Sequence, residues 1–176
     1  IRWGTYKYAW SIQPFAIFYR NTIFLCVVNI VGITLSSSLV AYAFARLRFW
    51  GRDILFLICL ATMMLPQQVT LVPMYVVWAT LKLVNTYWPL IVPQWLANAY
   101  NVFLLRQFIM TISHEMDDSA RIDGAGWFRI YAQIIVPMAR PALGVVAIQA
   151  FTFNWNNFMQ PLIYLSTREK FTIAIG

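Results

Sequence analysis

The sequence predicts an all-α protein, a polytopic transmembrane helical bundle, and three observations lead to this prediction. Of its 176 residues, 61% are hydrophobic and only 11% are charged, whereas soluble domains carry about 25% charged residues. The mean hydropathy is +0.64. Several apolar stretches approach the length of about 20 residues that a membrane-spanning helix needs. We therefore expect one transmembrane domain over residues 1–176, with about four spanning helices.

The four expected spans follow one another along the chain as Thr22–Ala45, Ile54–Val77, Trp88–Leu105 and Pro141–Leu165. The first contains no charge, and the others contain prolines: Pro66, Pro73, Pro89, Pro93, Pro141 and Pro161. Because lipid offers the backbone no hydrogen-bond partners, helices must form these spans. A soluble helical core would need amphipathic faces with charged side chains, and these stretches have almost none. The sequence therefore favours the membrane.

Small residues recur at helical spacing in the first span. Ser37, Ala41 and Ala45 are four residues apart, and Gly32 and Ser36 form a second pair with the same spacing. Such spacing lets two helix backbones approach closely in lipid. We expect this helix to lie inside the bundle.

Arginines in two loops predict the orientation. Both loops lie on one side of the membrane, and they contain Arg46, Arg48, Arg52, Arg106, Arg121, Arg129 and Arg140. The positive-inside rule makes that side cytoplasmic. The opposite side carries fewer basic residues per loop, namely Arg2, Lys7, Arg20, Lys82, Arg168 and Lys170.

A polar segment, Asp117–Pro141, separates the third span from the fourth. Just before it, Ser113 is placed to cap a helix that begins near His114. Acidic residues follow in the first turns, where they favour the positive end of the helix dipole. Asp117 and Asp118 are four and three residues before Arg121, so either carboxylate can pair with it on one face. We expect a short capped helix here.

A turn and a second helix follow within the polar segment. Asp123-Gly124-Ala125-Gly126 should end the first helix, because glycine accepts backbone angles that other residues resist. The second helix has an apolar face formed by Trp127, Ile130, Tyr131 and Ile134, and we expect Pro137 to end it. Such a connection is longer than the usual 2–8 residues between helices. It is either a docking surface or an interfacial amphipathic helix without a partner.

The polar segment resembles the signature of the permease subunits of ABC importers. That signature reads Glu-Ala-Ala, three residues, Gly, nine residues, then Ile-x-Leu-Pro. This chain has Asp118-Ser119-Ala120, three residues, Gly124, nine residues, then Ile134-Ile135-Val136-Pro137. Asp replaces Glu, Ser replaces the first Ala, and Val replaces Leu, while the spacing is unchanged.

The resemblance extends over nearly all 176 residues. The segments "AYAFARLRFWGRD", "ATMMLPQQVTLVPMY", "NTYWPLIVP", "FLLRQF", "RIDGA" and "FNWNNFMQPLIYL" are each similar to the carbohydrate-uptake branch, the permeases of the maltose and glycerol-phosphate type. Members of this branch usually have one more membrane helix before this region and one after it. The resemblance therefore implies a fragment that lacks the first and last membrane helices.

The resemblance also implies a function. Such a permease translocates a sugar or sugar-like solute inward by alternating access, and residues 112–140 form a cytoplasmic coupling loop that a separate ATP-binding cassette ATPase grips. The residues implied in coupling are Asp118, Ser119, Ala120, Asp123, Gly124, Ala125, Ile134 and Pro137. ATP and Mg would bind to the ATPase. Further implied partners are a second permease subunit, an extracytoplasmic solute-binding protein and lipid of a bacterial or archaeal inner membrane, which the chain crosses several times.

The sequence contains no catalytic or metal-binding motif that we recognise. It contains no GxxxxGK[ST] phosphate loop, no HExxH motif and no Ser/His/Asp or Cys/His pattern. Cys26 and Cys59 fall in apolar stretches, and His114 is the only histidine. The basic residues are dispersed rather than aligned in a stripe. We expect no catalytic site, no metal site, no bound cofactor and no nucleic-acid partner.

Neutral polar side chains in the spans are candidates for a substrate path. Gln67 and Gln68 follow Pro66, which can open a helix toward a cavity. Trp155 and Asn156 are candidates because they resemble the Trp-Asn segment of the family. Amides bond hydroxyl groups and aromatic rings stack on sugars, although amides also join helices to one another. The spans hold few ionisable groups, which disfavours ion coupling. An ATP-independent channel or secondary carrier for a small polar solute is the alternative function.

Overall fold

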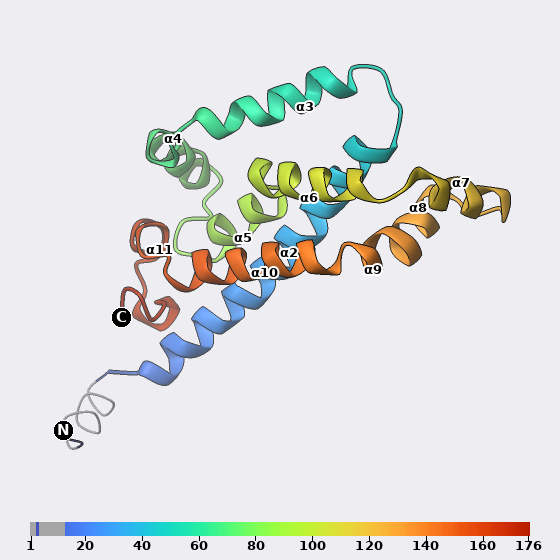
Figure 1. The fold of residues 1–176 in the computed structure, drawn as a ribbon. Helices are drawn as coiled ribbons and strands as arrows, with labels where there is room; N and C mark the ends of the chain where they lie inside the picture. The colour runs from blue at the N-terminus through green and yellow to red at the C-terminus, as the bar shows by residue number, and fades with distance from the viewer. Residues whose placement is uncertain (1–2, 4–12) are drawn as a thin grey trace. The chain divides into compact units, whose positions relative to one another are not determined.

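A computed structural model describes Trp3 and residues 13–176 of the chain, and in that part the regular elements are helices (Figure 1). The main helices are α2 (Phe15–Arg46), α3 (Arg52–Ala61), α4 (Gln67–Thr80), α5 (Trp88–Trp95), α6 (Ala99–Thr111), α7 (His114–Ile122), α8 (Trp127–Ile130), α9 (Val136–Met138), α10 (Arg140–Trp155) and α11 (Met159–Tyr164). Short 3-10 turns lie at Thr62–Met64 and Arg168–Lys170, and a π-helical turn lies at Tyr131–Ile135. The all-α prediction is confirmed.

The chain divides into two compact units. Unit one comprises Ile1–Ile30, Gln67–Gln94 and Ala150–Gly176, and unit two comprises Val31–Pro66 and Trp95–Gln149. Helices α2 and α10 each contribute residues to both units. Each unit is described by itself below.

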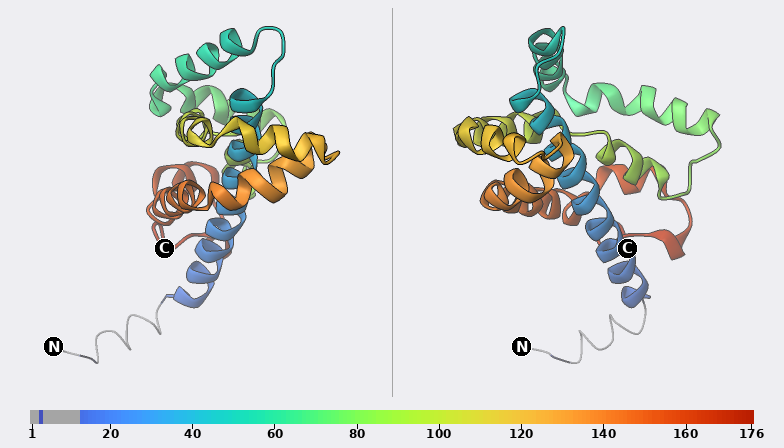
Figure 2. Two further views of the ribbon diagram at one scale, coloured as in Figure 1. Left: turned by 45° about the vertical axis from the view of Figure 1, so that its right-hand side comes forward. Right: turned by 90° about the vertical axis from the view of Figure 1, so that its right-hand side faces the viewer.

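Helix α2 contains the first predicted span and extends it at its amino-terminal end. It has 32 residues, and it is the long blue helix in both views of Figure 2. By length and composition it is the one helix of the described residues that can cross a membrane unaided. Two bent helix pairs raise the number of candidate spans to three. The sequence predicts about four spanning helices, and by length and composition the described residues supply from one to three candidates.

The other predicted spans are interrupted. Leu65 and Pro66 separate the 3-10 turn from α4, because proline has no backbone N–H and restricts the residue before it. The third span is two helices, since Ala97 has a φ of 59° between α5 and α6. The fourth is divided where α10 ends at Trp155 and α11 begins at Met159. Hydropathy predicts apolar length, and it does not detect these local breaks.

Unit one has an apolar core with a hydrogen-bonded rim. The core comprises Leu25, Trp78, Leu90, Tyr164 and Leu165. Asn29 joins α2 to its neighbours, because its side-chain amide donates to the Leu90 carbonyl at 3.1 Å and to the Asn154 side chain at 2.6 Å. This asparagine therefore joins helices, which is one of the two roles expected for amides in the spans.

Asn85 fastens the end of α11 to the turn that follows α4. Its backbone has a φ of 62°, and its backbone N–H donates to the Tyr164 carbonyl at 2.7 Å. Its side-chain oxygen accepts the backbone N–H groups of Ser166 and Thr167, each at 3.1 Å. Asparagine tolerates the left-handed region better than most residues. One asparagine can therefore adopt the backbone conformation of this turn and also make these hydrogen bonds.

Unit two packs around the second half of α2. Ser37 and Ala41 are fully buried and Gly32 is buried as well, whereas Ser36 and Ala45 are half-buried, so three of the five small residues lie on the packed face as their spacing predicts. Val102, Leu105 and Ile109 of α6 and Val146 of α10 are among the other buried apolar residues of this unit. The reason for a glycine at position 32 is direct: a Cβ there would overlap the Trp95 indole ring.

Replacing Gly32 with alanine should lower the free energy of unfolding by about 1–3 kcal/mol, because the added methyl group must displace the Trp95 ring. Gly144→Ala in α10 is the matched control. A Cβ at position 144 meets nothing within 4 Å, so this change should stabilise the helix by about 0.5–1 kcal/mol. Thermal unfolding of the purified permease, followed by tryptophan fluorescence, measures both. Equal midpoints for the two variants would contradict the close contact.

Candidate functional site

The polar segment begins with the capped helix that the sequence predicts. Helix α7 runs from His114 to Ile122, and the Ser113 side chain accepts the backbone N–H of Glu115 at 3.2 Å. The hydroxyl thereby satisfies one of the N–H groups that have no partner within the helix. Glu115 and Asp117 lie in its first turn, where acidic side chains favour the positive end of the helix dipole. The cap prediction is confirmed.

Gly124 ends α7 in a Schellman motif. Its φ is +79°, a conformation that favours glycine. The Gly124 N–H donates to the Arg121 carbonyl and the Ala125 N–H donates to the Ala120 carbonyl, each at 2.9 Å. These bonds satisfy two carbonyls at the helix end and reverse the chain. In Figure 1, α7 and α8 consequently run back along one another.

Asp117 forms a buried ion pair with Arg46, the last residue of α2. Arg46 Nε lies 3.2 Å from Asp117 Oδ2, and the two side chains are only 1% and 5% exposed. Arg46 Nη2 also donates to the Ile112 carbonyl at 2.7 Å, just before α7 begins. Removing one partner of a buried pair leaves an uncompensated charge. The amino-terminal half of α7 is therefore fastened to α2.

The predicted pairing of Asp117 or Asp118 with Arg121 is not what the structure has. Arg121 lies over the Trp127 ring, with its guanidinium carbon 3.6 Å from the ring centroid. Asp117 lies on the buried face of α7, where Arg46 reaches it, and Asp118 is exposed. Helical spacing permitted the local pair, and packing against α2 decided against it.

Two tyrosines fasten the second half of the polar segment to the same helix. The Tyr131 hydroxyl lies 2.7 Å from the Ser38 hydroxyl, and the Tyr42 hydroxyl donates to the Trp127 carbonyl at 3.1 Å. Ser38, Tyr42 and Arg46 are four residues apart on α2, so they form one stripe along it. We call these three residues the α2 anchor. The anchor holds the helices on both sides of the Gly124 turn.

Pro137 does not end the second helix, contrary to the prediction. The helical path passes from α8 through the π-helical turn Tyr131–Ile135 and continues in α9 to Met138. The Val136 N–H bonds to the carbonyl five residues earlier, at Tyr131. A π turn just before a proline accommodates the missing N–H. The break comes after Met138, where this helical stretch and α10 meet at 78°.

The buried face of the second helix is not quite the predicted one. The sequence predicts Trp127, Ile130, Tyr131 and Ile134 on one apolar face. In the structure, Ile130, Tyr131 and Ile135 are buried, whereas Trp127 is 44% exposed and Ile134 is partly exposed. Ile135 follows Tyr131 by four residues, so it is the i+4 neighbour of a residue on the predicted face.

The side of α7 and its turn that faces away from the α2 anchor is exposed. Asp118, Ser119, Asp123 and Gly124 are exposed, and Ala120 and Ala125 are half-buried. Ile134 and Pro137 are also half-buried. We call Asp118, Ser119, Asp123 and Gly124 the exposed tip. The exposed tip presents carboxylates and a turn at a glycine without a side chain, which suits docking to another macromolecule. The buried Arg46–Asp117 pair on the opposite side of α7 holds this helix in one position.

The candidate substrate-path residues that the structure describes make local contacts. Gln68 is exposed in α4, and the side chain of Gln67 lies outside the described part of the structure. The Trp155 ring packs against Phe151, with 5.4 Å between ring centroids. The Asn156 side-chain amide donates to the Thr152 carbonyl at 2.8 Å. Among the described side chains, no hydrogen bond or ring contact joins Gln68 to this pair.

Arg46 belongs to this site, although the sequence indicates it only as a topology signal. Ser38, Tyr42 and Arg46 place polar groups every fourth residue along α2, and this spacing is a signal that could have indicated a common face. Asp117 was named as an acidic residue of α7, but the sequence does not distinguish its role from that of Asp118. No three His, Cys, Asp or Glu side chains among Trp3 and residues 13–176 gather as metal ligands.

Comparisons with known proteins identify relatives of this chain. The family model described as "Binding-protein-dependent transport system inner membrane component" matches residues 32–173. The arabinooligosaccharides transport system permease protein AraQ of Halalkalibacterium halodurans is 36% identical over 158 residues, which cover 90% of this chain and 56% of that protein. The sn-glycerol-3-phosphate transport system permease protein UgpE of Yersinia pestis is 32% identical over 180 residues, covering 99% of this chain and 64% of that protein.

A solved structure has the same fold. It is a bacterial ABC transporter involved in the import of the acidic polysaccharide alginate, with a TM-score of 0.82 and 28% identity over 89% of this chain and 55% of that chain. The present chain thus spans little more than half the length of several proteins that it matches. These are membrane components of transport systems rather than enzymes. The match over residues 32–173 shows that the chain belongs to the family of binding-protein-dependent transport system inner membrane components.

Proposed function

We propose that this chain forms part of the permease subunit of an ATP-driven ABC importer, which translocates a sugar or sugar-like solute inward by alternating access. Residues 112–140 serve as the cytoplasmic coupling loop of a single permease domain over residues 1–176. A separate ATP-binding cassette ATPase binds ATP and Mg and grips the loop between Asp118 and Pro137. The single observation that carries this proposal is that α7 is buried against α2 on one side and exposed on the other.

The two sides of α7 have opposite properties, and coupling needs both. One side is fixed to α2 by the buried Arg46–Asp117 pair, with side chains 1% and 5% exposed. The other side is the exposed tip, where Asp118 and Gly124 face away from the protein. A force applied at the tip is therefore delivered to the end of a 32-residue helix. An amphipathic helix resting on lipid needs no such buried fastening to its neighbour.

The proposed substrate class rests on the family and its members. The matched permeases are named for arabinooligosaccharides and sn-glycerol 3-phosphate, and the structural neighbour imports alginate. These solutes share a polyhydroxylated carbon skeleton. Amide side chains such as Gln67, Gln68 and Asn156 can bond hydroxyl groups, and Trp155 can stack on a sugar ring. We propose these four as residues of the substrate pathway.

The proposed assembly contains further components. A second permease subunit completes the pathway, and an extracytoplasmic solute-binding protein delivers the solute. The family is an inner-membrane component, and we propose that the chain crosses that membrane several times, with the polar segment on the cytoplasmic side.

The test is co-purification of the full-length permease from mild detergent, followed by reconstitution into liposomes. We expect a stable complex with a P-loop ATPase, and uptake that requires ATP when a panel of labelled sugars and glycerol 3-phosphate is supplied. Collapsing the ion gradients with ionophores should leave that uptake unchanged. Uptake without any ATPase, or uptake abolished by the ionophores, would instead identify a channel or a secondary carrier.

A further inference from the structure

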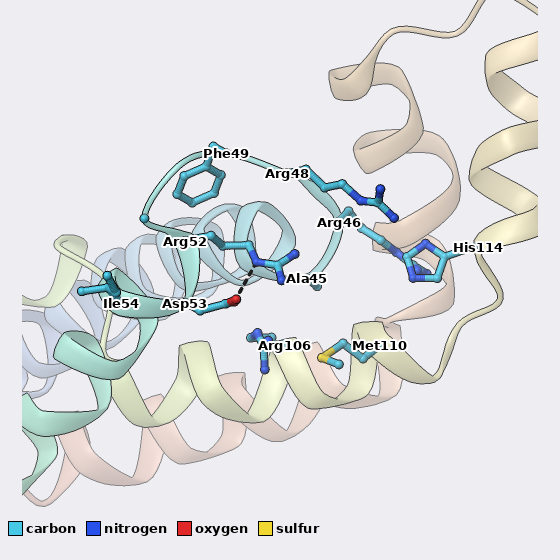
Figure 3. A pocket seen from close by; sticks show the side chains of 11 residues that line it. Ala45, Arg46, Arg48, Phe49, Arg52, Asp53, Ile54, Arg106, Met110 and His114 are labelled. Atoms are coloured by element: carbon cyan, nitrogen blue, oxygen red, sulfur yellow. Dashed lines mark hydrogen bonds and ion pairs between the residues drawn. The ribbon is translucent and has the colours of Figure 1, made fainter.

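A cavity of about 680 Å³ lies in unit two beside the end of α2 (Figure 3). It is lined by the end of α2, the loop after it, the first turn of α3, and residues of α6 and α7. Its polar lining is arginine-rich, with Arg46, Arg48, Arg52 and Arg106 around it and Asp53 as its single carboxylate. The lining thus carries a formal charge of +3. Arg46 also belongs to the α2 anchor, whereas Arg48, Arg52 and Arg106 have no part in the proposed coupling role.

Two of the four arginines have carboxylate partners. Arg52 pairs with Asp53 at 2.9 Å, and Arg46 pairs with Asp117 at 3.2 Å. Arg48 is exposed, and within the described residues no carboxylate lies within ion-pair distance of Arg48 or Arg106. Two positive charges at this cavity therefore have no ion-pair partner in the described part of the chain.

Arg106 is held in place by its surroundings. Its guanidinium carbon lies 4.1 Å from the centroid of the Phe56 ring, and its Nε donates to the Phe44 carbonyl at 3.3 Å. These contacts fix the plane of the guanidinium group without neutralising it. A planar fork of N–H donors held in one orientation matches the oxygens of a phosphate group.

A buried donor without a partner provides an independent indication of a ligand. Arg46 lines the cavity, its side chain is 1% exposed, and its Nη1 has no hydrogen-bond partner. An unpaired buried donor is costly, and an anion in the cavity would give it an acceptor. The first turn of α3 opens on the same space, because Gly51, Arg52, Asp53 and Ile54 all line it and Gly51 offers no side-chain cap.

The apolar part of the surroundings fits the boundary of a membrane. Phe49, Ile54 and Met110 line the cavity beside the arginines. Trp50, next in the loop, is 96% exposed, and α3 has no buried residue. Basic pockets beside transmembrane helices on the cytoplasmic side bind anionic head groups. A head-group phosphate at the arginines would place an acyl chain along α3.

We propose that this cavity is a binding site for a phosphate group, with Arg48, Arg106 and Arg46 as its ligands. The phosphate belongs either to the head group of an anionic phospholipid or to free inorganic phosphate. Both sources present the same oxygens to the arginines, and the apolar rim accommodates the lipid.

The test uses the full-length permease in nanodiscs of phosphatidylcholine alone or of phosphatidylcholine with phosphatidylglycerol. A ligand that binds only the folded state raises its stability, and we expect phosphatidylglycerol to raise the unfolding midpoint by about 3 °C. A second arm titrates inorganic phosphate into the phosphatidylcholine discs against chloride of equal ionic strength. A rise in the first arm alone identifies the lipid, and a rise in the second arm identifies free phosphate.

Matched variants connect the shift to the cavity. Arg48→Gln and Arg106→Gln should abolish the rise and lower the lipid phosphorus retained per permease after delipidation. Arg140→Gln is the control, because Arg140 is exposed and does not line the cavity. This variant should keep both the rise in the unfolding midpoint and the retained lipid phosphorus. Arg48 is exposed, so its variant should fold even if the Arg106 variant does not. The proposal is overturned if neither arm shifts the midpoint, or if Arg48→Gln and Arg140→Gln respond alike.

Discussion

Replacing Asp117 with alanine is expected to destabilise the permease by about 3–5 kcal/mol, which is the cost of leaving a buried charge without its partner. Arg46 would keep its hydrogen bond to the Ile112 carbonyl at 2.7 Å, but its charge would stay in a site where the side chain is only 1% exposed. For a protein of this size, the unfolding midpoint should fall by about 10 °C. Thermal unfolding of the purified permease in detergent measures the change.

The neighbouring carboxylate supplies the matched control. Asp118 is exposed, so Asp118→Ala should change stability by about 0.5 kcal/mol or less. The same change should weaken ATPase binding if the exposed tip is the docking surface. We therefore expect Asp117→Ala to lower stability and Asp118→Ala to weaken ATPase binding, although the two residues are adjacent in the sequence. Equal midpoints for the two variants would refute the buried ion pair as the fastening of α7.

A double variant distinguishes the ion pair from the packing around it. Arg46→Met combined with Asp117→Leu removes both charges and keeps side-chain volume in the site. Replacing a buried pair by apolar residues is often neutral or stabilising, so we expect the midpoint to return to within about 2 °C of the original. A midpoint as low as that of Asp117→Ala would mean that the volume of the site, rather than its charge balance, determines stability.

Gly124→Trp is expected to abolish ATP-driven uptake while the protein remains folded in the membrane. A Cβ at position 124 meets nothing within 4 Å, and Gly124 is exposed, so we expect the larger side chain to be accommodated at the surface. The positive φ of +79° adds about 1–2 kcal/mol of backbone strain. The ring would therefore obstruct only a partner that approaches the turn closely.

The measurement is the amount of ATPase retained by immobilised permease, together with membrane levels and uptake of the labelled sugar panel. Gly124→Asn is the matched control, because asparagine tolerates the left-handed conformation and adds little bulk. It should retain most of the binding. A tryptophan variant that binds the ATPase and drives uptake like the unmodified protein would remove Gly124 from the docking surface.

The features predicted correctly from the sequence are those with local physical causes. The Ser113 cap follows from a hydroxyl placed beside a helix start, and the end of α7 follows from a glycine that accepts a positive φ. The part of α2 over Thr22–Ala45 follows from a long apolar stretch without proline. Each needs only neighbouring residues, so each can be found without knowing the fold.

The features predicted wrongly depend on where backbone hydrogen bonds break within apolar stretches. Hydropathy cannot distinguish a continuous helix from two helices joined at Ala97, where the φ is 59°. Nor did the proline rule locate the end of the second helix, since the π turn absorbed the missing N–H of Pro137 and the helical stretch continued to Met138. These breaks depend on how the helices pack. Several local arrangements have nearly equal energies, so the local sequence does not select one of them.

The sequence by itself determined the all-α membrane class, the capped helix and glycine turn of the polar segment, and the motif spacing from Asp118 to Pro137. Only the tertiary structure decided that the Asp117 carboxylate of α7 is buried and that the Asp118 carboxylate is exposed. Asp117 and Asp118 are chemically equivalent neighbours, and helical spacing allowed both to pair with Arg121. Their roles separate because Arg46, 71 positions before Asp117 in the numbering, is brought against one side of the helix, and desolvation then requires the carboxylate on that side to neutralise it.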